Sequence, residues 1–120
     1  MSFKLLLEEL VSNVRGAEGA IFLDAEGEAV EWYTNGNGER LRLRAAYVAV
    51  VLQAARAVAS RLNAGKTNHL VLCYDGAKFI IDELESGYFL VLELNTSANI
   101  GEAQYRIQPT AAKLRREIVA

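Results

Sequence analysis

The stretch LRLRAAYVAVVLQAARAVASRL, residues 41–62, decides how this chain folds. Laid out at about 100° per residue, it predicts a long helix with two adjoining apolar flanks, whereas a surface helix of a small domain normally shows one apolar stripe. The first flank consists of Leu43, Tyr47, Val50, Ala54 and Val58. The second consists of Val48, Val51, Leu52, Ala55, Ala59 and Leu62. One flank can pack on the chain's own sheet, so we expect the other to be buried by a second copy of the chain.

The remaining side of this helix is a narrow polar line formed by Arg42, Gln53, Arg56 and Ser60, with Ala49 in the gap. No Asp or Glu occurs from Arg40 to Leu62, although the whole chain carries a net charge of −2. The helix is therefore a local basic strip. It is either a solubilising face or a docking surface for an acidic partner, since arginine is enriched at interfaces.

The composition indicates one soluble globular domain over residues 1–120. Hydrophobic residues make up 52% and charged residues 23% of the chain, which suits a packed core rather than disorder. The acidic net charge argues against nucleic acid as a partner. The amphipathic N-terminus does not resemble a signal peptide, and the longest apolar run, Ala45–Leu52, is too short to span a bilayer, which needs roughly 20 residues. We therefore expect a cytoplasmic protein that does not insert into membranes.

The rest of the chain alternates strands and helices. We expect a first helix over residues 3–14 with Ser2 as its N-cap, and a hairpin of strands 20–23 and 29–34. Arginines at the start of the long helix oppose its macrodipole, so it is expected to begin nearer Arg42 or Arg44 than Arg40, and to end at residues 63–65. Strands 69–74 and 77–84 flank the hairpin signal Asp75-Gly76, and a further strand covers residues 88–94.

The later strands are apolar at successive positions, as in residues 70–72 and 89–92. Both faces of the sheet must therefore be covered, which three helices around five strands can do. The final helix is expected over residues 99–120, with Ser97 or Asn99 as its cap. Because Pro109 lies inside it, we expect either a kink or a second short helix with Gln108 as N-cap.

Residues suited to catalysis or to metal binding are scarce. The chain has one cysteine, Cys73, and one histidine, His69, and along one strand they would lie about 13 Å apart, too far for a nucleophile and its base. Glu83 and Glu85 are expected to be solvated charges, and His69 a hydrogen-bonded edge residue. The glycine-rich loop 35–38 lacks the lysine of a phosphate-binding loop. The sequence therefore predicts no enzyme activity of its own, no catalytic residues, no metal and no cofactor.

Two motifs resemble those of the Roadblock/dynein-light-chain domain family. The run Val14-Arg15-Gly16-Ala17-Glu18-Gly19-Ala20, continued by residues 21–24 and Gly27, is similar to the family's opening signature. Asn99-Ile100-Gly101 is similar to the Asn-Leu-Gly start of the family's last helix. The resemblance covers essentially the whole chain. It implies an α+β fold, a three-layer α/β/α sandwich whose five-stranded antiparallel sheet has the long helix on one face and the two terminal helices on the other.

The resemblance also implies a homodimer. Family members pair their third strands edge to edge and set their two long helices side by side. Here the edge strand would be residues 69–74. The implied interface residues are Tyr47, Val48, Val51, Leu52, Ala55, Leu70, Val71, Leu72 and Cys73.

The function that the resemblance implies is non-enzymatic. Bacterial members similar to MglB bind a small Ras-like GTPase across the paired long helices and stimulate its hydrolysis or control its position. On this chain the corresponding surface would be Arg42, Ala49, Gln53, Arg56 and Ser60. Docking is favoured over an arginine finger supplied by Arg56. A purely structural scaffold, like a dynein light chain, is the alternative, and a small-molecule sensor is a third hypothesis.

Overall fold

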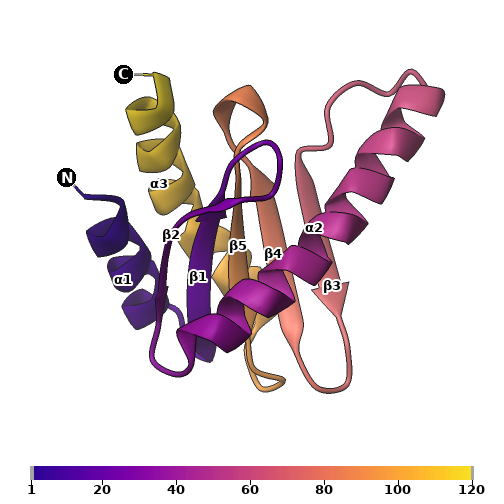
Figure 1. Ribbon diagram of the computed structural model, residues 1–120. Coiled ribbons are helices and arrows are strands. Elements are labelled where there is room, and N and C mark those ends of the chain that lie inside the picture. The colour runs from indigo at the N-terminus through magenta and orange to yellow at the C-terminus, as the bar shows by residue number, and fades with distance from the viewer. Residues whose placement is uncertain (1, 120) are drawn as a thin grey trace.

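Five strands form one antiparallel sheet in the order β2-β1-β5-β4-β3, and helices cover both of its faces (Figure 1). The structure is a computed structural model that describes residues 2–119. The helices are α1 (Phe3–Asn13), α2 (Gly38–Arg61) and α3 (Ile100–Val119), with a short 3₁₀ turn, η1 (Glu85–Gly87). The strands are β1 (Ala17–Leu23), β2 (Ala29–Thr34), β3 (His69–Cys73), β4 (Lys78–Glu83) and β5 (Phe89–Leu94).

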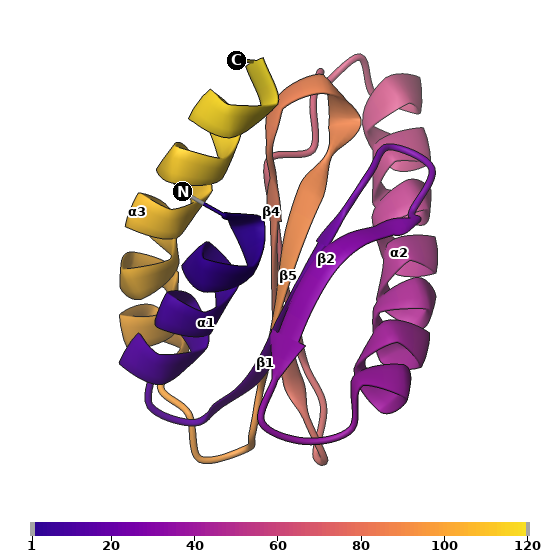
Figure 2. The ribbon, with the colours of Figure 1, turned by 60° about the vertical axis from the view of Figure 1, so that its left-hand side comes forward.

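The molecule has three layers. Helix α2 lies on one face of the sheet, and α1 and α3 lie side by side on the other and run in opposite directions (Figure 2). The predicted element order, sheet and layers are therefore confirmed, and the strand bounds differ from the prediction by at most three residues.

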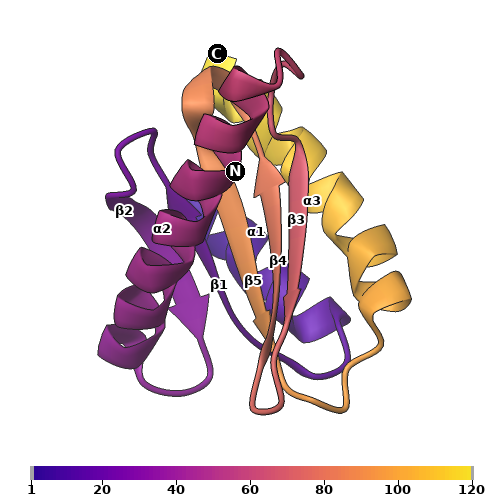
Figure 3. The same cartoon turned by 90° about the vertical axis from the view of Figure 1, so that its right-hand side faces the viewer.

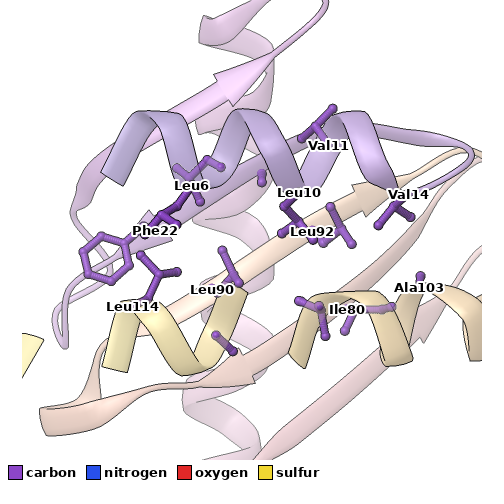
Figure 4. Close-up of a cluster of buried hydrophobic side chains, with 14 of the residues drawn as sticks. Leu6, Leu10, Val11, Val14, Phe22, Ile80, Leu90, Leu92, Ala103 and Leu114 are labelled. Atoms are coloured by element: carbon purple, nitrogen blue, oxygen red, sulfur yellow. The ribbon is translucent and has the colours of Figure 1, made fainter. Parts of the chain in front are cut away.

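Each face of the sheet has its own hydrophobic core. Leucines of α1 and small or branched side chains of α3 meet β1, β4 and β5 on one face, where Leu10, Phe22, Leu90 and Leu114 are buried (Figure 4). On the other face α2 packs on Ile21, Leu23, Phe79, Ile81, Phe89 and Val91. The strand residues alternate between the two cores, as the period of two along a strand requires. This explains why the central strands are apolar at successive positions.

Helix α1 and the turn after it follow from local chemistry. The hydroxyl of Ser2 accepts a hydrogen bond from the N–H of Leu5 at 3.1 Å, which confirms Ser2 as the N-cap. After the helix, Gly16 has a φ of +86°, and a Cβ at this position would lie 2.8 Å from the Cβ of Ala98. Only glycine fits this close approach without displacing its neighbours. The glycine of the opening motif is therefore required by packing between this turn and the segment before α3.

The start of α2 corrects the prediction from sequence. The helix begins at Gly38 rather than near Arg42 or Arg44, because Asn37 accepts hydrogen bonds from the N–H groups of Glu39 and Arg40 at 2.9 and 3.1 Å. This cap and the acidic Glu39 in the first turn offset the unfavourable arginines. At the other end, the N–H of Asn63 donates to the carbonyl of Ser60 and the N–H of Ala64 donates to that of Ala59. Asn63 takes the left-handed conformation, with a φ of 54°, that commonly ends a helix.

Helix α3 is unbroken from Ile100 to Val119, with Pro109 inside it. The prediction of a second short helix capped by Gln108 is therefore wrong. Asn99 is the N-cap, since its side chain accepts a hydrogen bond from the N–H of Glu102 at 2.8 Å. The Gln108 amide instead donates to the carbonyl of Gln104 at 3.2 Å, one turn earlier. Burial of Ala103, Ile107, Ala111 and Leu114 on one face holds the helix together across the proline.

Candidate partner-binding surface

The outward face of α2 is apolar over most of its length. Its side chains Leu43, Tyr47, Val50 and Val58 are 59%, 69%, 66% and 55% exposed, and Ala54 between them is also exposed. These five residues are the first apolar flank identified from the sequence. A monomeric domain rarely leaves so continuous an apolar surface in water. The described chain therefore does not cover this flank.

The opposite side of α2 is the one that packs on the sheet. Leu41, Ala45, Val48, Ala49 and Leu52 are buried there. Of the interface residues implied by the resemblance, Val48 and Leu52 are thus already covered by the chain's own sheet, Val51 and Ala55 are half-buried, and Tyr47 is exposed. Ala49, implied as a GTPase contact, is likewise buried. These three buried side chains are unavailable to a partner in this arrangement.

By length and composition α2 could cross a membrane, and it is the only such helix within residues 2–119. The expectation that no segment is long enough rested on the uninterrupted run Ala45–Leu52, which is shorter than the helix. Just 22% of the most apolar window is buried in the single chain. The same composition suits a helix that contacts protein on two sides, and α2 lies along a sheet on one of them.

Two arginines of α2 form ion pairs with glutamates of the sheet. Arg44 lies 3.0 Å from the carboxylate of Glu93, and Arg56 lies 3.6 Å from that of Glu83. The side chains of Glu83 and Glu93 are only 9% and 8% exposed. The prediction that Glu83 is a solvated charge is therefore wrong. Its partner is remote in sequence, so no local pattern could have revealed the pair.

Arg56 makes further contacts that fix its orientation. Its guanidinium donates to the carbonyl of Gly87 at 3.1 Å and lies 5.5 Å from the centre of the Phe89 ring. The side chain therefore turns inward, over the β4–β5 connection, instead of standing out from the helix. Arg42 also lies over an aromatic ring, that of Trp32, at 4.6 Å. The polar line of α2 is thus divided: Arg42, Gln53 and Ser60 are exposed, while Ala49 and Arg56 face the sheet.

Burial raises the pKa of the Glu93 carboxyl above its usual range, and the nearby carboxylate of Glu18 adds to this shift. Arg44 and Arg40 lower the same pKa but do not cancel the effect of burial. Arg44 therefore offsets only part of the free-energy cost of burying the Glu93 carboxylate. The desolvation cost of such a buried ion pair can exceed its Coulombic gain, so the pair is weak evidence for stabilisation of the fold.

The two edges of the sheet differ in how they present their main chain. At β2, the N–H of Trp32 donates a hydrogen bond to the carboxylate of Glu31 at 3.0 Å, and the ammonium of Lys4 lies 3.8 Å from that carboxylate. Such charged groups protect an edge from pairing with another strand. Strand β3 forms the other edge (Figure 3). Its residues Leu70, Val71 and Leu72 are half-buried and uncharged. Strand β3 is therefore the unprotected edge.

An apolar hollow of about 410 Å³ lies between α2 and the β3–β4 hairpin, next to the end of this edge. Tyr47 and Val51 line it from the helix, and Tyr74 and Phe79 line it from the β3–β4 hairpin. Tyr74 is 56% exposed. The outward face of α2, the hollow and the β3 edge thus form one continuous surface, which we call the α2/β3 surface. Cys73, at the end of this edge, is exposed.

The α2/β3 surface offers contacts rather than chemistry. Within the described part of the chain, no three His, Cys, Asp or Glu side chains are placed to hold a metal ion. The residues that line the hollow include no nucleophile paired with a base. What the surface presents is exposed aromatic and aliphatic side chains beside an open strand edge, with Arg42 and Gln53 on its margin.

Comparison with known proteins agrees with this arrangement. Residues 3–93 match the profile of the Roadblock/LC7 domain. A Roadblock/LC7 domain from Streptomyces avermitilis is similar in structure, with a TM-score of 0.87 at 17% identity over 98% of both chains. The gliding protein MglB of Thermus thermophilus gives a TM-score of 0.83 at 22% identity, covering 95% of this chain and 86% of that one.

MglC of Myxococcus xanthus is 29% identical, with a TM-score of 0.70 over 98% of this chain and 99% of that one. No curated protein sequence matches significantly. The profile match spans more than half of the chain, and the element order of the fold agrees with it. The chain therefore belongs to the Roadblock/LC7 domain family.

Proposed function

We propose that this protein is a homodimeric, non-enzymatic regulator or adaptor that binds a small Ras-like GTPase across its paired α2 helices. The observation that carries this proposal is the exposed apolar flank of α2 beside the uncharged β3 edge. Membership of the Roadblock/LC7 family and the fold shared with MglB support it.

In the proposed dimer the two β3 edges pair and the two α2 helices lie side by side. Each strand edge then gains the hydrogen-bond partners that it lacks in the single chain. Tyr47, Val50 and Tyr74 leave water, and complete burial of a large apolar side chain contributes about 1.5–3 kcal/mol. Several such side chains on each copy are enough to offset the entropy lost on association. Cys73 and Leu70–Leu72 then lie close to the two-fold axis.

For the GTPase surface we propose Arg42, Gln53 and Ser60, which are exposed on the margin of α2. Dimerisation would present this margin twice on one side of the assembly. Arg56 belongs to the predicted surface by sequence, but its contacts with Glu83 and Gly87 hold it against the sheet. Arg56 would have to leave both partners to reach a nucleotide, so we propose docking without an arginine finger.

A structural scaffold with no effect on nucleotide turnover is the second candidate. The inward orientation of Arg56 favours it, because a regulator that stimulates hydrolysis usually supplies or orders a catalytic group. The two candidates differ in one measurable quantity. Binding without a change in the rate of GTP hydrolysis would favour the scaffold, whereas faster hydrolysis would favour the regulator.

The proposal is tested in two steps. Sedimentation velocity at micromolar concentration should give the mass of a dimer, and a monomer would contradict the proposal. A Ras-like GTPase from the same genome, loaded with a non-hydrolysable GTP analogue, should then bind the dimer in a titration followed by calorimetry. The double variant Arg42→Glu/Gln53→Glu should weaken this binding about tenfold or more, and Arg116→Glu, on the opposite layer, is the matched control. Equal binding by both variants would show that the proposed surface is wrong.

A further inference from the structure

A second hollow lies on the face of the molecule opposite α2. It has a volume of about 630 Å³ and runs between α1 and α3. Glu9, Leu10 and Asn13 line it from α1, and Tyr105, Arg106 and Lys113 are among its lining residues from α3. We call it the α1/α3 groove. Because α2 is on the other side of the sheet (Figure 2), nothing in the proposed dimer or GTPase surface uses this groove.

The wall formed by α3 has a regular pattern. Arg106, Pro109, Thr110 and Lys113 all line the groove, and their spacing of i, i+3, i+4 and i+7 places them along one line of a helix. The two cations stand at the ends of this line, about 10 Å apart by helix rise. Between them the proline ring and the largely buried Thr110 present a low surface. The wall therefore carries two positive charges, separated by a short stretch without charged side chains.

Neither cation is paired within the described part of the chain. No acidic side chain of residues 2–119 lies within ion-pair distance of Arg106 or Lys113, whereas Arg44 and Arg56 of α2 each have a buried glutamate. In a chain with a net charge of −2, the α3 wall keeps two positive charges open to solvent. Tyr105 stands beside them and is 77% exposed, the largest exposed fraction among the large hydrophobic side chains of the described chain.

We infer that the α1/α3 groove binds an acidic amphipathic helix of a partner protein. Two carboxylates seven residues apart on that helix would pair with Arg106 and Lys113. Leucine-sized side chains three and four residues after the first carboxylate would lie over Pro109 and Thr110, against Tyr105. A helix laid in a groove between two helices is a recurrent mode of recognition, read by anchors at i, i+3, i+4 and i+7. Glu9, on the α1 wall, disfavours an acidic residue on the side of the ligand helix that faces α1. It therefore favours the rotation of the ligand that turns its two carboxylates toward α3.

The inference is tested with a designed probe. The probe is a fluorescein-labelled, acetylated and amidated helical peptide with the pattern Glu-x-x-Leu-Leu-x-x-Glu. Its fluorescence anisotropy should rise on titration with the wild-type protein, and amide resonances of α1 and α3, including those of Asn13 and Tyr105, should shift in a ¹⁵N-resolved NMR spectrum. A peptide with lysine at both glutamate positions should bind about tenfold more weakly or not at all.

Matched variants separate this groove from general charge effects. Arg106→Glu/Lys113→Glu should weaken binding of the glutamate peptide by about tenfold or more, with an unchanged thermal midpoint because neither side chain has a partner in the core. Arg116→Glu, an arginine of α3 that does not line the groove, should bind the peptide as the wild type does. Equal binding of the two peptides, equal binding by the double variant, or shifts confined to α2 would overturn the inference.

Self-association is the main rival occupant of the groove. If a second copy fills it, the double variant would lower the mass measured by sedimentation, and this result would also count against the inference. A dimer that survives the double variant but loses the peptide supports it. Since the peptide test does not depend on α2 or on any GTPase, it can succeed where the proposed function fails.

Discussion

The imidazole Nδ1 of His69 lies 2.5 Å from Oδ1 of Asp82, directly across the β3–β4 ladder. Asp82 is only 3% exposed and lies on the apolar face that α3 covers. On its other side the His69 ring meets the amide of Gln104, at 2.8 Å from Nε2. The first residue of the unprotected edge strand is thereby tied to a buried carboxylate and to α3, which confirms His69 as a hydrogen-bonded edge residue.

Removing this histidine should destabilise the fold. His69→Ala would leave the buried Asp82 carboxylate without its closest donor, and an unsatisfied buried polar group costs about 1–3 kcal/mol. Urea unfolding followed by circular dichroism measures the loss. In a double-mutant cycle, His69→Ala/Asp82→Asn should lose less than the sum of the two single variants, since the amide tolerates the missing donor better than the carboxylate does. Additive losses would show that the two side chains are not coupled.

A charged residue introduced on the outward face of α2 should dissociate the proposed dimer without unfolding the chain. Val50 is 66% exposed, so Val50→Glu should change the unfolding free energy of the single chain by no more than about 0.5 kcal/mol. In the proposed dimer it would place two carboxylates in an apolar interface and should shift the sedimentation profile from dimer to monomer. Leu5→Glu, an exposed leucine of α1, is the matched control and should leave the mass unchanged. If the Val50→Glu protein remained dimeric, the dimer interface would have to lie elsewhere than on the outward face of α2.

The raised pKa of Glu93 predicts a dependence of stability on pH. Between the ordinary value of 4.5 and the higher pKa of the folded state, the folded chain binds more protons than the unfolded chain. The unfolding free energy contributed by this group therefore falls as the pH rises through that window. Glu93→Gln cannot titrate, so the stability of the wild type relative to this variant should decline over the same window. Glu26→Gln, on an exposed turn, is the control and should show no such decline.

The sign of this effect is the informative result. If the wild type gains stability relative to Glu93→Gln as the pH rises above 4.5, the prediction is wrong. The attraction of Arg44 would then outweigh the burial of the Glu93 carboxylate, and its pKa would not be raised. Thermal unfolding in buffers matched for ionic strength measures the difference, because salt screens the more exposed charges of Glu18 and Arg40.

Local signals allowed most of the fold to be predicted from the sequence. The cap at Ser2, the turn at Asp75-Gly76 and the periodicity of residues 41–62 each act within a few residues, and each is confirmed. The start of α2 was mispredicted because the macrodipole argument was given more weight than the hydrogen bonds that Asn37 provides. A cap formed by two such bonds outweighs the modest repulsion of exposed arginines.

The candidate surface could be predicted only in part. Helical periodicity identified Tyr47 and Val50 as members of an apolar flank, and the structure shows that this flank is the exposed one. The inward turn of Arg56 could not be foreseen, since it depends on Glu83 and Gly87, which reach α2 only after the sheet has formed. The polar cluster of His69, Asp82 and Gln104 was missed for the same reason, as it joins three elements that are distant in sequence.

Replacing the proline inside α3 should stabilise the protein. Pro109 has no N–H to donate to the carbonyl of Tyr105, yet α3 continues through it because its buried face supplies the packing. Pro109→Ala would restore that hydrogen bond, and the helix-propensity difference in a helix interior is about 3 kcal/mol. Proline also restricts the unfolded chain by about 0.4–1 kcal/mol, which opposes the gain. The net expectation is an increase of about 2–2.6 kcal/mol in the unfolding free energy, measured by urea titration. Arg116→Ala, an exposed position of the same helix, is the control. An unchanged or lower stability of Pro109→Ala would mean that the helix bends around the proline to relieve its cost.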